Sequence, residues 1–269
     1  MPRALPDLRP WGKVFVMDIQ LIPAFSDNYV YLFKDPTSEA VGIVDPGEAG
    51  PVLKALDRLG WRPTHIFNTH HHADHIGGNA ELKRQFGCTI VGPAADRNRI
   101  PDLDVSVGDG DTYRFGSQEV RVFATPGHTS GHISLWFPEA SALFSGDTLF
   151  ALGCGRLFEG TPAQMWNSLL KLRALPAETR VYCGHEYTLS NARFAVTVDP
   201  DNTALKERAA DIAVLRDSGK PTIPSTLGVE RATNPFLRAD DAGVAAAVGL
   251  AGADPVEVFA EIRRRKDTF

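Results

Sequence analysis

The chain contains little cysteine. It has three in 269 residues, Cys88, Cys154 and Cys183, and no two of them form a C-x-x-C pair. The odd number and the wide spacing predict free thiols in a reducing compartment, so we expect a cytoplasmic protein. We expect Cys154 and Cys183 to be buried neighbours of other groups and not metal ligands or nucleophiles.

Long apolar runs are also missing. No run approaches the ~20 residues that span a bilayer, so we expect no membrane contact. Residues 1–16 contain three Pro and two Arg but no apolar core, unlike a secretory signal. They are either a disordered lead or residues upstream of a true start at Met17, and the sequence leaves both possibilities open.

An excess of positive charge is the third absence. The formal net charge is −5 and the pI is about 5.9. This balance argues against a general polyanion binder, and we expect no nucleic-acid partner.

The length fits one large domain, or one domain with a smaller one attached.

Histidine, in contrast, is concentrated in short motifs. Residues 69–75 read THHHADH and place four potential metal ligands within six positions: His70, His72, Asp74 and His75. Imidazole and carboxylate suit zinc, iron and manganese. Positions 70, 72 and 74 share one face of an extended chain, and position 75 falls out of step. One loop could therefore supply two neighbouring metals.

Three later segments complete the set, which argues against an accidental surface run of histidine. They are TPGHTSGH at 125–132, SGDTLF at 145–150 and CGHEY at 183–187. They contribute His128, Asp147 and His185, respectively, and Asp147 follows the apolar run 141–144.

This ordered series resembles the metallo-β-lactamase superfamily, in which T-H-x-H-x-D-H is followed by a His, a bridging Asp and a last His. The resemblance implies one metal on His70, His72 and His128, a second on Asp74, His75 and His185, and Asp147 bridging both. Each metal would keep an open side, as catalysis requires. His71 would point away from the metals. His65 and His132 would be structural.

The first two thirds of the chain alternate short apolar runs with Gly, Asp and Pro turns. Strands are predicted at 19–22, 30–33, 40–44, 65–68, 89–91, 120–124, 133–137, 142–145 and 180–183, and helices at 51–59, 77–86 and 162–172. Thr161 and Pro162 suit the N-cap and first position of the last helix. The pattern alone predicts mixed α and β structure. The resemblance implies an α+β fold, the four-layer αββα sandwich.

After residue 188 the pattern becomes helical. We predict a helix over 191–218, an irregular link at 222–227, a turn at 234–238, and a closing helix over 255–266 capped by Asp254. We therefore expect a catalytic domain at 17–188. A small helical domain at 189–269 would lie over the edge of the sandwich.

Further segments narrow the resemblance to one family. They are DNYVYL at 27–32, GCGR at 153–156, CGHEYT at 183–188, NPF at 234–236 and RRRKD at 263–267. Together they resemble glyoxalase II, the hydroxyacylglutathione hydrolases, over about residues 17–269. The implied reaction is hydrolysis of S-D-lactoylglutathione and other 2-hydroxyacylglutathiones to D-lactate and glutathione by a metal-bridging hydroxide, in methylglyoxal detoxification. The C-terminal helical region is one that most superfamily relatives lack.

The resemblance also implies roles for individual side chains. The catalytic residues would be Asp74 and Asp147, and the glutathione-binding residues would be Arg156, Tyr187, Arg263 and Lys266. Arg263 and Lys266 are three apart on a predicted helix and share a face. Charge alone would favour a solvated basic tail, and the family match favours binding.

Two positions depart from the family pattern. Arg156 stands where the family usually has Lys, and a planar guanidinium does not simply replace an ammonium group. Phe158 stands where many members have a tyrosine that hydrogen-bonds the substrate. Both departures concern substrate affinity more than the metal centre.

We expect two divalent metal ions per chain, with zinc first and iron or manganese as alternatives. We also expect a monomer. The principal competing function is a mononuclear-iron persulfide (sulfur) dioxygenase on the same scaffold. The motifs and the helical C-terminal region argue against a β-lactam or lactone hydrolase. The net charge of −5 argues against a nuclease, and the open sides of the two metals argue against a non-enzymatic metal-binding module.

Overall fold

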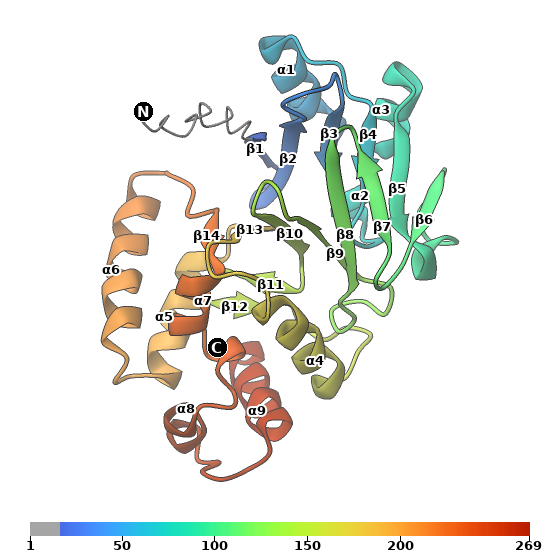
Figure 1. Cartoon of the computed structure of the whole chain (residues 1–269). Helices are drawn as coiled ribbons and strands as arrows, with labels where there is room; N and C mark the ends of the chain where they lie inside the picture. Colours follow the sequence, from blue (N-terminus) through green and yellow to red (C-terminus); the bar gives the residue numbers. More distant parts are fainter. Residues whose placement is uncertain (1–16) are drawn as a thin grey trace, which may run out of the picture.

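The computed structural model describes residues 17–269, so the predictions for residues 1–16 lie outside the described residues. Two six-stranded sheets pack face to face, and helices lie on the outer sides (Figure 1). The first sheet has the order β1 (Asp18–Ala24), β2 (Asn28–Lys34), β3 (Val41–Val44), β4 (His65–Phe67), β5 (Thr89–Pro93) and β6 (Val105–Val107). The second has the order β14 (Ser225–Thr226), β13 (Arg180–Cys183), β10 (Ala142–Gly146), β9 (Ile133–Phe137), β8 (Gln118–Ala124) and β7 (Thr112–Phe115). This is the αββα sandwich that the resemblance implies.

Strand direction brings distant loops to the same place. In the first sheet β3, β4, β5 and β6 run parallel, so the loops that follow β3 and β4 leave from one edge. In the second sheet β10 and β13 are also parallel, although β9 and β14 pair with them antiparallel. The segments after β10 and after β13 therefore start side by side, even though about 35 residues separate them in sequence.

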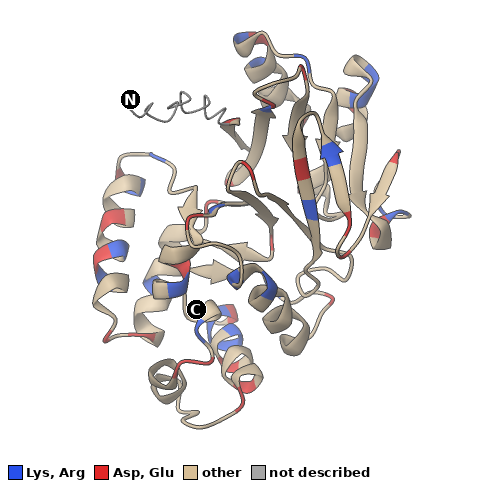
Figure 2. Cartoon of the chain, in the orientation of Figure 1, with Lys and Arg blue, Asp and Glu red and all other residues tan. Residues whose placement is uncertain are grey.

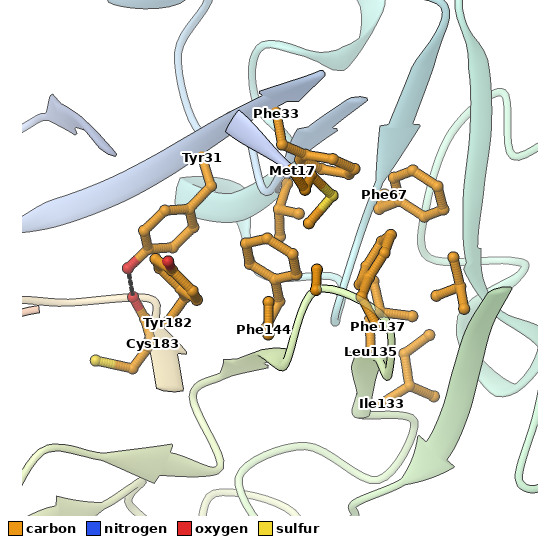
Figure 3. Close-up of a cluster of buried hydrophobic side chains, with 14 of the residues drawn as sticks. Met17, Tyr31, Phe33, Phe67, Ile133, Leu135, Phe137, Phe144, Tyr182 and Cys183 are labelled. Carbon is orange, nitrogen blue, oxygen red and sulfur yellow. Dashed lines mark hydrogen bonds between the residues drawn. The ribbon is translucent and has the colours of Figure 1, made fainter. Parts of the chain in front are cut away.

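The core between the sheets is aromatic (Figure 3). Phe33 stacks on Phe144 with ring centroids 5.4 Å apart, and it meets Phe137 edge-on at 5.2 Å. The Tyr31 hydroxyl group crosses from the first sheet to donate a 2.5 Å hydrogen bond to the Cys183 carbonyl oxygen. Truncation of one such buried ring to alanine typically costs about 3–5 kcal/mol. This packing fixes the two sheets relative to each other.

Helices cover the outer faces. On the first sheet lie α1 (Ala49–Leu59), α2 (Ala73–Ile76) and α3 (Asn79–Phe86), and the 3-10 helix η1 (Ala94–Asp96) follows β5. On the second sheet lies α4 (Pro162–Arg173), and α9 (Pro255–Asp267) packs on α4, with the Phe259 ring next to that of Trp166. α4 begins with the predicted Thr161 cap and Pro162, and Gln164 completes a capping box.

The C-terminal region comprises α5 (Thr188–Val198), α6 (Thr203–Asp217), α7 (Leu227–Thr233), the 3-10 helix η2 (Pro235–Leu237), α8 (Ala242–Ala247) and α9. The prediction of one helix over 191–218 is wrong, because α5 ends at Val198 and a separate helix, α6, begins at Thr203. Asn202 caps the second helix by accepting a 3.0 Å hydrogen bond from the Leu205 amide. The predicted link at 222–227 contains strand β14. The predicted closing helix and its Asp254 cap are confirmed.

The hairpin of β11 (Leu149–Phe150) and β12 (Gly153–Cys154) joins the helical region to the sandwich. The buried Glu230 carboxylate accepts the Leu152 amide at 2.9 Å and the Asn234 side-chain amide at 3.1 Å. Asn234 also donates to the carbonyl oxygen atoms of Phe150 and Gly153, each at 3.1 Å. A buried polar network in which every group has a hydrogen-bond partner is rigid, so this network fixes the position of the hairpin.

The three cysteines are free, as their spacing predicts, and Cys154 and Cys183 are buried as expected, as is Cys88. Among residues 17–269, none of the helices combines the length and the hydropathy that a bilayer-spanning segment needs.

Candidate active site

The histidine-rich segment leaves the carboxyl end of β4 and enters α2. His70 and His72 lie before the helix, and His72 is its extended N-cap residue. Asp74 lies in the first turn of α2, so the prediction that it continues the extended alternation of 70 and 72 is wrong. The turn of the helix separates Asp74 and His75 from the two preceding histidines. One short segment thus feeds two neighbouring groups.

The first group consists of His70, His72 and His128. The Nε2 atoms of His70 and His128 lie 3.0 and 3.1 Å from Nδ1 of His72. Nitrogen atoms that share a tetrahedral zinc ion at about 2.0–2.1 Å lie about 3.3 Å apart. The three nitrogen atoms therefore have nearly the spacing of ligands to one ion.

The second group consists of Asp74, His75 and His185. The Asp74 Oδ2 atom lies 3.5 Å from Nε2 of His75 and 3.5 Å from Nε2 of His185. Asp147 lies between the two groups: its Oδ2 atom is 3.2 Å from Nε2 of His185 and 3.4 Å from Nε2 of His128. All seven side chains singled out as ligands in the sequence thus come together at one place.

Two buried atoms at the centre of the cluster show that its donors suit a cation. Among residues 17–269, His75 Nε2 and Asp147 Oδ1 are two of the few buried side-chain atoms that have no hydrogen-bond partner, and they lie 3.6 Å apart. Leaving buried polar atoms unpaired is costly and rare. A divalent cation would satisfy both atoms, so the residues present fit such an ion.

Protonation within the cluster supports the same fit. Burial, with help from neighbouring histidines, lowers the pKa of His70 well below its ordinary value and leaves the neutral imidazole that metal binding needs. Burial would also lower the pKa of His75, but the Asp147 and Asp45 carboxylates outweigh burial and raise that pKa well above its ordinary value. The acidic side of the cluster therefore attracts positive charge.

Asp45 supports the cluster from behind, and the sequence analysis missed it. It follows β3, and its Oδ2 atom lies 3.1 Å from Nδ1 of His75. The same carboxylate accepts the Thr69 amide at 2.8 Å and the Thr69 hydroxyl at 2.6 Å. A carboxylate at Nδ1 fixes the ring and leaves Nε2 for the metal. The available signal was an Asp that ends an apolar strand and precedes Pro46.

Asp27, in the turn before β2, and Asn28, the first residue of β2, support the other ligands of the second group. Asp27 Oδ1 lies 2.9 Å from Nδ1 of His185, and Asn28 donates a 2.9 Å hydrogen bond from its amide to Asp74 Oδ2. Both residues belong to the DNYVYL segment, which contributed to the family resemblance but gave no indication of these contacts.

Asp147 is held by its backbone as well. Gly146, immediately before it, has a φ of +48°, a conformation that favours glycine. The Asp147 amide donates to Nε2 of His132 at 3.0 Å. A Cβ atom on Gly184 would lie 2.4 Å from Asp147 Oδ1, so close approach requires glycine there.

The remaining histidines lie outside the two groups. His71 turns away, with Nδ1 3.1 Å from the buried Asp96 carboxylate. His132 is buried between Asp147 and the hydroxyl of Thr125. His65 stacks on Phe67 with ring centroids 5.9 Å apart. These contacts are of the structural kind expected for His65 and His132.

A cavity of about 550 Å³ opens from the metal-ligand cluster. Its lining combines ligands with all four predicted substrate residues: His72, Asp74, His128, Asp147 and His185 on one side, and Arg156, Tyr187, Arg263 and Lys266 on the other. Phe150, Phe158 and Cys154 complete its apolar wall. A ligand bound among the cationic side chains would therefore reach the metal-ligand groups.

Two aromatic rings border the ligands. The Tyr187 ring lies parallel to that of His185, with centroids 4.7 Å apart. Phe158 is 62% exposed, and its ring centroid lies 5.1 Å from that of His128. Phe158 thus contributes an apolar surface beside the ligands.

The cationic side chains that line the cavity differ in their burial and in their contacts. Arg156 is largely exposed. Lys266 is half-buried, donates to the Ser190 hydroxyl at 2.9 Å, and lies near the rings of Phe194 and Phe269. Arg263 is buried, and its guanidinium lies over Phe236. Arg263 and Lys266 therefore reach the same cavity, but in different surroundings.

Comparison with known proteins defines the class of this site. Residues 25–185 match the family model described as the metallo-beta-lactamase superfamily, and residues 186–269 match the model of the hydroxyacylglutathione hydrolase C-terminus. The fold and the His/Asp cluster thus define a divalent-metal protein of the metallo-β-lactamase type.

Close relatives narrow the class. The chain is 59% identical to the hydroxyacylglutathione hydrolase of Methylococcus capsulatus and 56% identical to that of Rhodospirillum rubrum. Each alignment covers 94% of this chain and 99% of the relative. The chain belongs to the hydroxyacylglutathione hydrolase family of this superfamily.

Solved structures of more distant proteins share the fold. ETHE1 from Myxococcus xanthus aligns with a TM-score of 0.66 at 28% identity, over 92% of this chain and 90% of that one. The protein TTHA1623 in a di-iron-bound form aligns with a TM-score of 0.57 at 28% identity, over 80% of this chain and 98% of that one.

Proposed function

We propose that this protein hydrolyses the thioester S-D-lactoylglutathione, and other 2-hydroxyacylglutathiones, to D-lactate and glutathione, and so serves methylglyoxal detoxification. The observation that carries the proposal is the single cavity that joins the seven-residue His/Asp cluster to Arg156, Tyr187, Arg263 and Lys266. The relatives that share more than half of the sequence support the same reaction.

We propose two divalent cations, with zinc as the expected metal and iron or manganese as alternatives. His70, His72 and His128 would hold one, Asp74, His75 and His185 the other, and Asp147 both. When bound, the cations lower the pKa of water and stabilise negative charge that develops on the carbonyl oxygen.

The side chains of the chain bind and orient the reactants. Asp74, held by Asn28, presents a carboxylate toward the cavity and can accept a hydrogen bond from a water molecule in one orientation. Arg156 and Lys266 supply positive charge for the carboxylates of glutathione. The leaving group is a thiolate, which departs readily, so the reaction needs no strong general acid.

This arrangement assigns catalysis and substrate binding to different parts of the chain. We propose a catalytic domain at 17–188 and a substrate-binding domain at 189–269, because the ligands come from the former and Lys266 from the latter. We also propose a cytoplasmic monomer.

The proposal is tested by the loss of thioester absorbance when purified protein is mixed with S-D-lactoylglutathione. Rapid hydrolysis that stops on chelation and returns with added zinc, iron or manganese is the expected result. If protein with two metals per chain leaves the thioester intact, the proposed substrate is wrong. Persulfide oxidation with iron and oxygen uptake then tests the dioxygenase alternative.

Lys266→Ala is expected to raise the KM for glutathione thioesters about 10- to 100-fold, since a hydrogen bond to a charged group contributes about 1.5–3 kcal/mol. Metal content should change little, because Lys266 lies outside the ligand groups. Steady-state kinetics and metal analysis of the same preparation measure both. An unchanged KM would remove the C-terminal helix from the substrate site.

The pH dependence of binding offers a separate test of Lys266. Burial, followed by the charges of Arg263 and Arg156, lowers the pKa of Lys266 to about 8. Lys266 is therefore charged below about pH 8 and loses its charge as the pH rises through that value. We expect kcat/KM, which reports the free enzyme, to fall over this range. Lys266→Arg should remove this fall, because arginine stays charged.

A further inference from the structure

A carboxylate of the chain itself lies among the cationic side chains of the cavity. Asp267, the last residue of α9, places Oδ1 2.9 Å from Nη2 of Arg263 and 3.8 Å from Nε of Arg156. Its side chain is 41% exposed and lines the cavity. Figure 2 shows basic residues concentrated on this last helix, near the C-terminus. The negative charge of Asp267 therefore sits where an anionic ligand would be attracted.

Both terminal nitrogen atoms of the Arg263 guanidinium already have partners. Nη1 donates a 2.8 Å hydrogen bond to the Cys154 carbonyl oxygen, and Nη2 pairs with Asp267. Nε is buried and, among residues 17–269, has no hydrogen-bond partner. Asp267 occupies the Nη2 side of Arg263, so an external carboxylate that binds there would displace Asp267 or share Nη2 with it. Two carboxylates at one guanidinium repel each other, so sharing is unfavourable.

Asp267 is placed so that it can move. It is the last residue of α9, and two fifths of its side chain is exposed. The Arg263–Asp267 pair joins positions i and i+4 on a helix, an interaction that is weak where water has access. The Asp267 side chain can therefore rotate into solvent when a second carboxylate takes its place, whereas Arg263 is fixed by burial, Cys154 and Phe236 and keeps an anionic partner throughout.

We propose that Asp267 is an internal anion that competes with a carboxylate of the substrate for Arg263 and Arg156, and thereby sets the affinity of the cavity for glutathione thioesters. This inference rests on the proposed function for the identity of the ligand. Exchange of one carboxylate for another leaves the net charge around Arg263 unchanged. The gain in free energy on binding is smaller than at an empty arginine pair, and product glutathione leaves more readily.

Asp267→Asn tests the proposal, since it removes the charge and keeps the size of the side chain. The KM for S-D-lactoylglutathione is expected to fall about 3- to 5-fold, the scale of a partly exposed charge interaction, while kcat changes less than about two-fold. Inhibition by product glutathione should strengthen by the same factor. The difference from wild type should shrink with added salt, because the charges are accessible to solvent. Asp267→Glu, which keeps the charge, should remain close to wild type.

Glu261→Gln is the matched control on the same helix. Glu261 pairs with Arg264 and Arg265, each at 2.8 Å, and does not line the cavity. The substitution removes one negative charge and two ion pairs from α9 without touching the ligand site. Its KM should equal that of wild type, which would show that the effect of Asp267 depends on its place in the cavity.

Sulfate binding to the metal-loaded proteins, measured by calorimetry, separates this inference from the proposed reaction. Tighter sulfate binding by Asp267→Asn than by wild type and Glu261→Gln supports the internal anion even if no thioester is hydrolysed. A raised KM, or sulfate affinity equal to that of wild type, would mean that Asp267 only holds Arg263 in place, and would overturn the inference. Thermal unfolding checks that each variant is folded, and Asp267→Ser replaces Asp267→Asn if that variant is not.

Discussion

Asp147→Asn is expected to lower kcat by about 10²–10³-fold or more and to release at least one metal ion per chain. Asp147 is the only residue of the described chain that this arrangement places against His75, His128 and His185 together. Asparagine has nearly the same shape but carries no charge and only one acceptor oxygen. It could therefore neither balance the two proposed dications nor offer an oxygen atom to each of them. Metal analysis and single-turnover kinetics measure the two effects.

A control for the loss of a buried carboxylate is available at Asp35. It is 1% exposed and accepts hydrogen bonds from Ser38, Ser117 and Gln118, away from the residues that line the cavity. Asp35→Asn should lower stability without changing metal content. An Asp147→Asn protein with full metal content and the wild-type rate would show that the bridging assignment is wrong.

Asp45→Asn is expected to weaken metal binding about 10- to 100-fold, with the Asp74, His75 and His185 group losing its metal first. The amide group of asparagine must place a donor toward either Thr69 or Nδ1 of His75, and this disturbs the orientation of the ring. The backbone should tolerate the change, since Asp45 has a φ of +49°, in a region that asparagine adopts readily. The effect therefore reports on the carboxylate and not on the turn.

Competition between the protein and a coloured chelator measures the affinity of each metal in the Asp45→Asn variant. The Asp35→Asn protein again serves as the comparison. Equal metal affinity in Asp45→Asn and wild type would mean that the His75 ring is held by its packing alone.

Local sequence patterns predicted the secondary structure correctly where the elements were long or had clear capping residues. The helix after Thr161 and the helix after Asp254 have strong N-terminal signals, and both begin where expected. The prediction of one helix over 191–218 was wrong. The apolar periodicity continues on both sides of the interruption between α5 and α6, which only the Asn202 cap and its neighbours mark. The two-residue strands β11 and β12 carry no local signal, since Glu230 and Asn234 hold them from elsewhere in the chain.

The sequence likewise predicted one part of the candidate site and missed another. Sequence motifs named all seven side chains that the structure gathers, because each ligand stands in a short segment with a family-like spacing. They did not indicate Asp45, whose role depends on β3 lying next to β4. Nor did they indicate that Arg263 is buried against Phe236 and paired, because both contacts arise from the packing of α9.

The sequence by itself determined which donor atoms are present, their order, and the strands that carry them, since these properties depend on neighbours a few positions apart. The tertiary structure alone decided how the donors meet. Asp147 and His185 converge because β10 and β13 run parallel, and Asp267 faces Arg156 because α9 packs beside the hairpin of β11 and β12. Distances between groups that are a hundred residues apart depend on sheet pairing and core packing, and no local pattern encodes them.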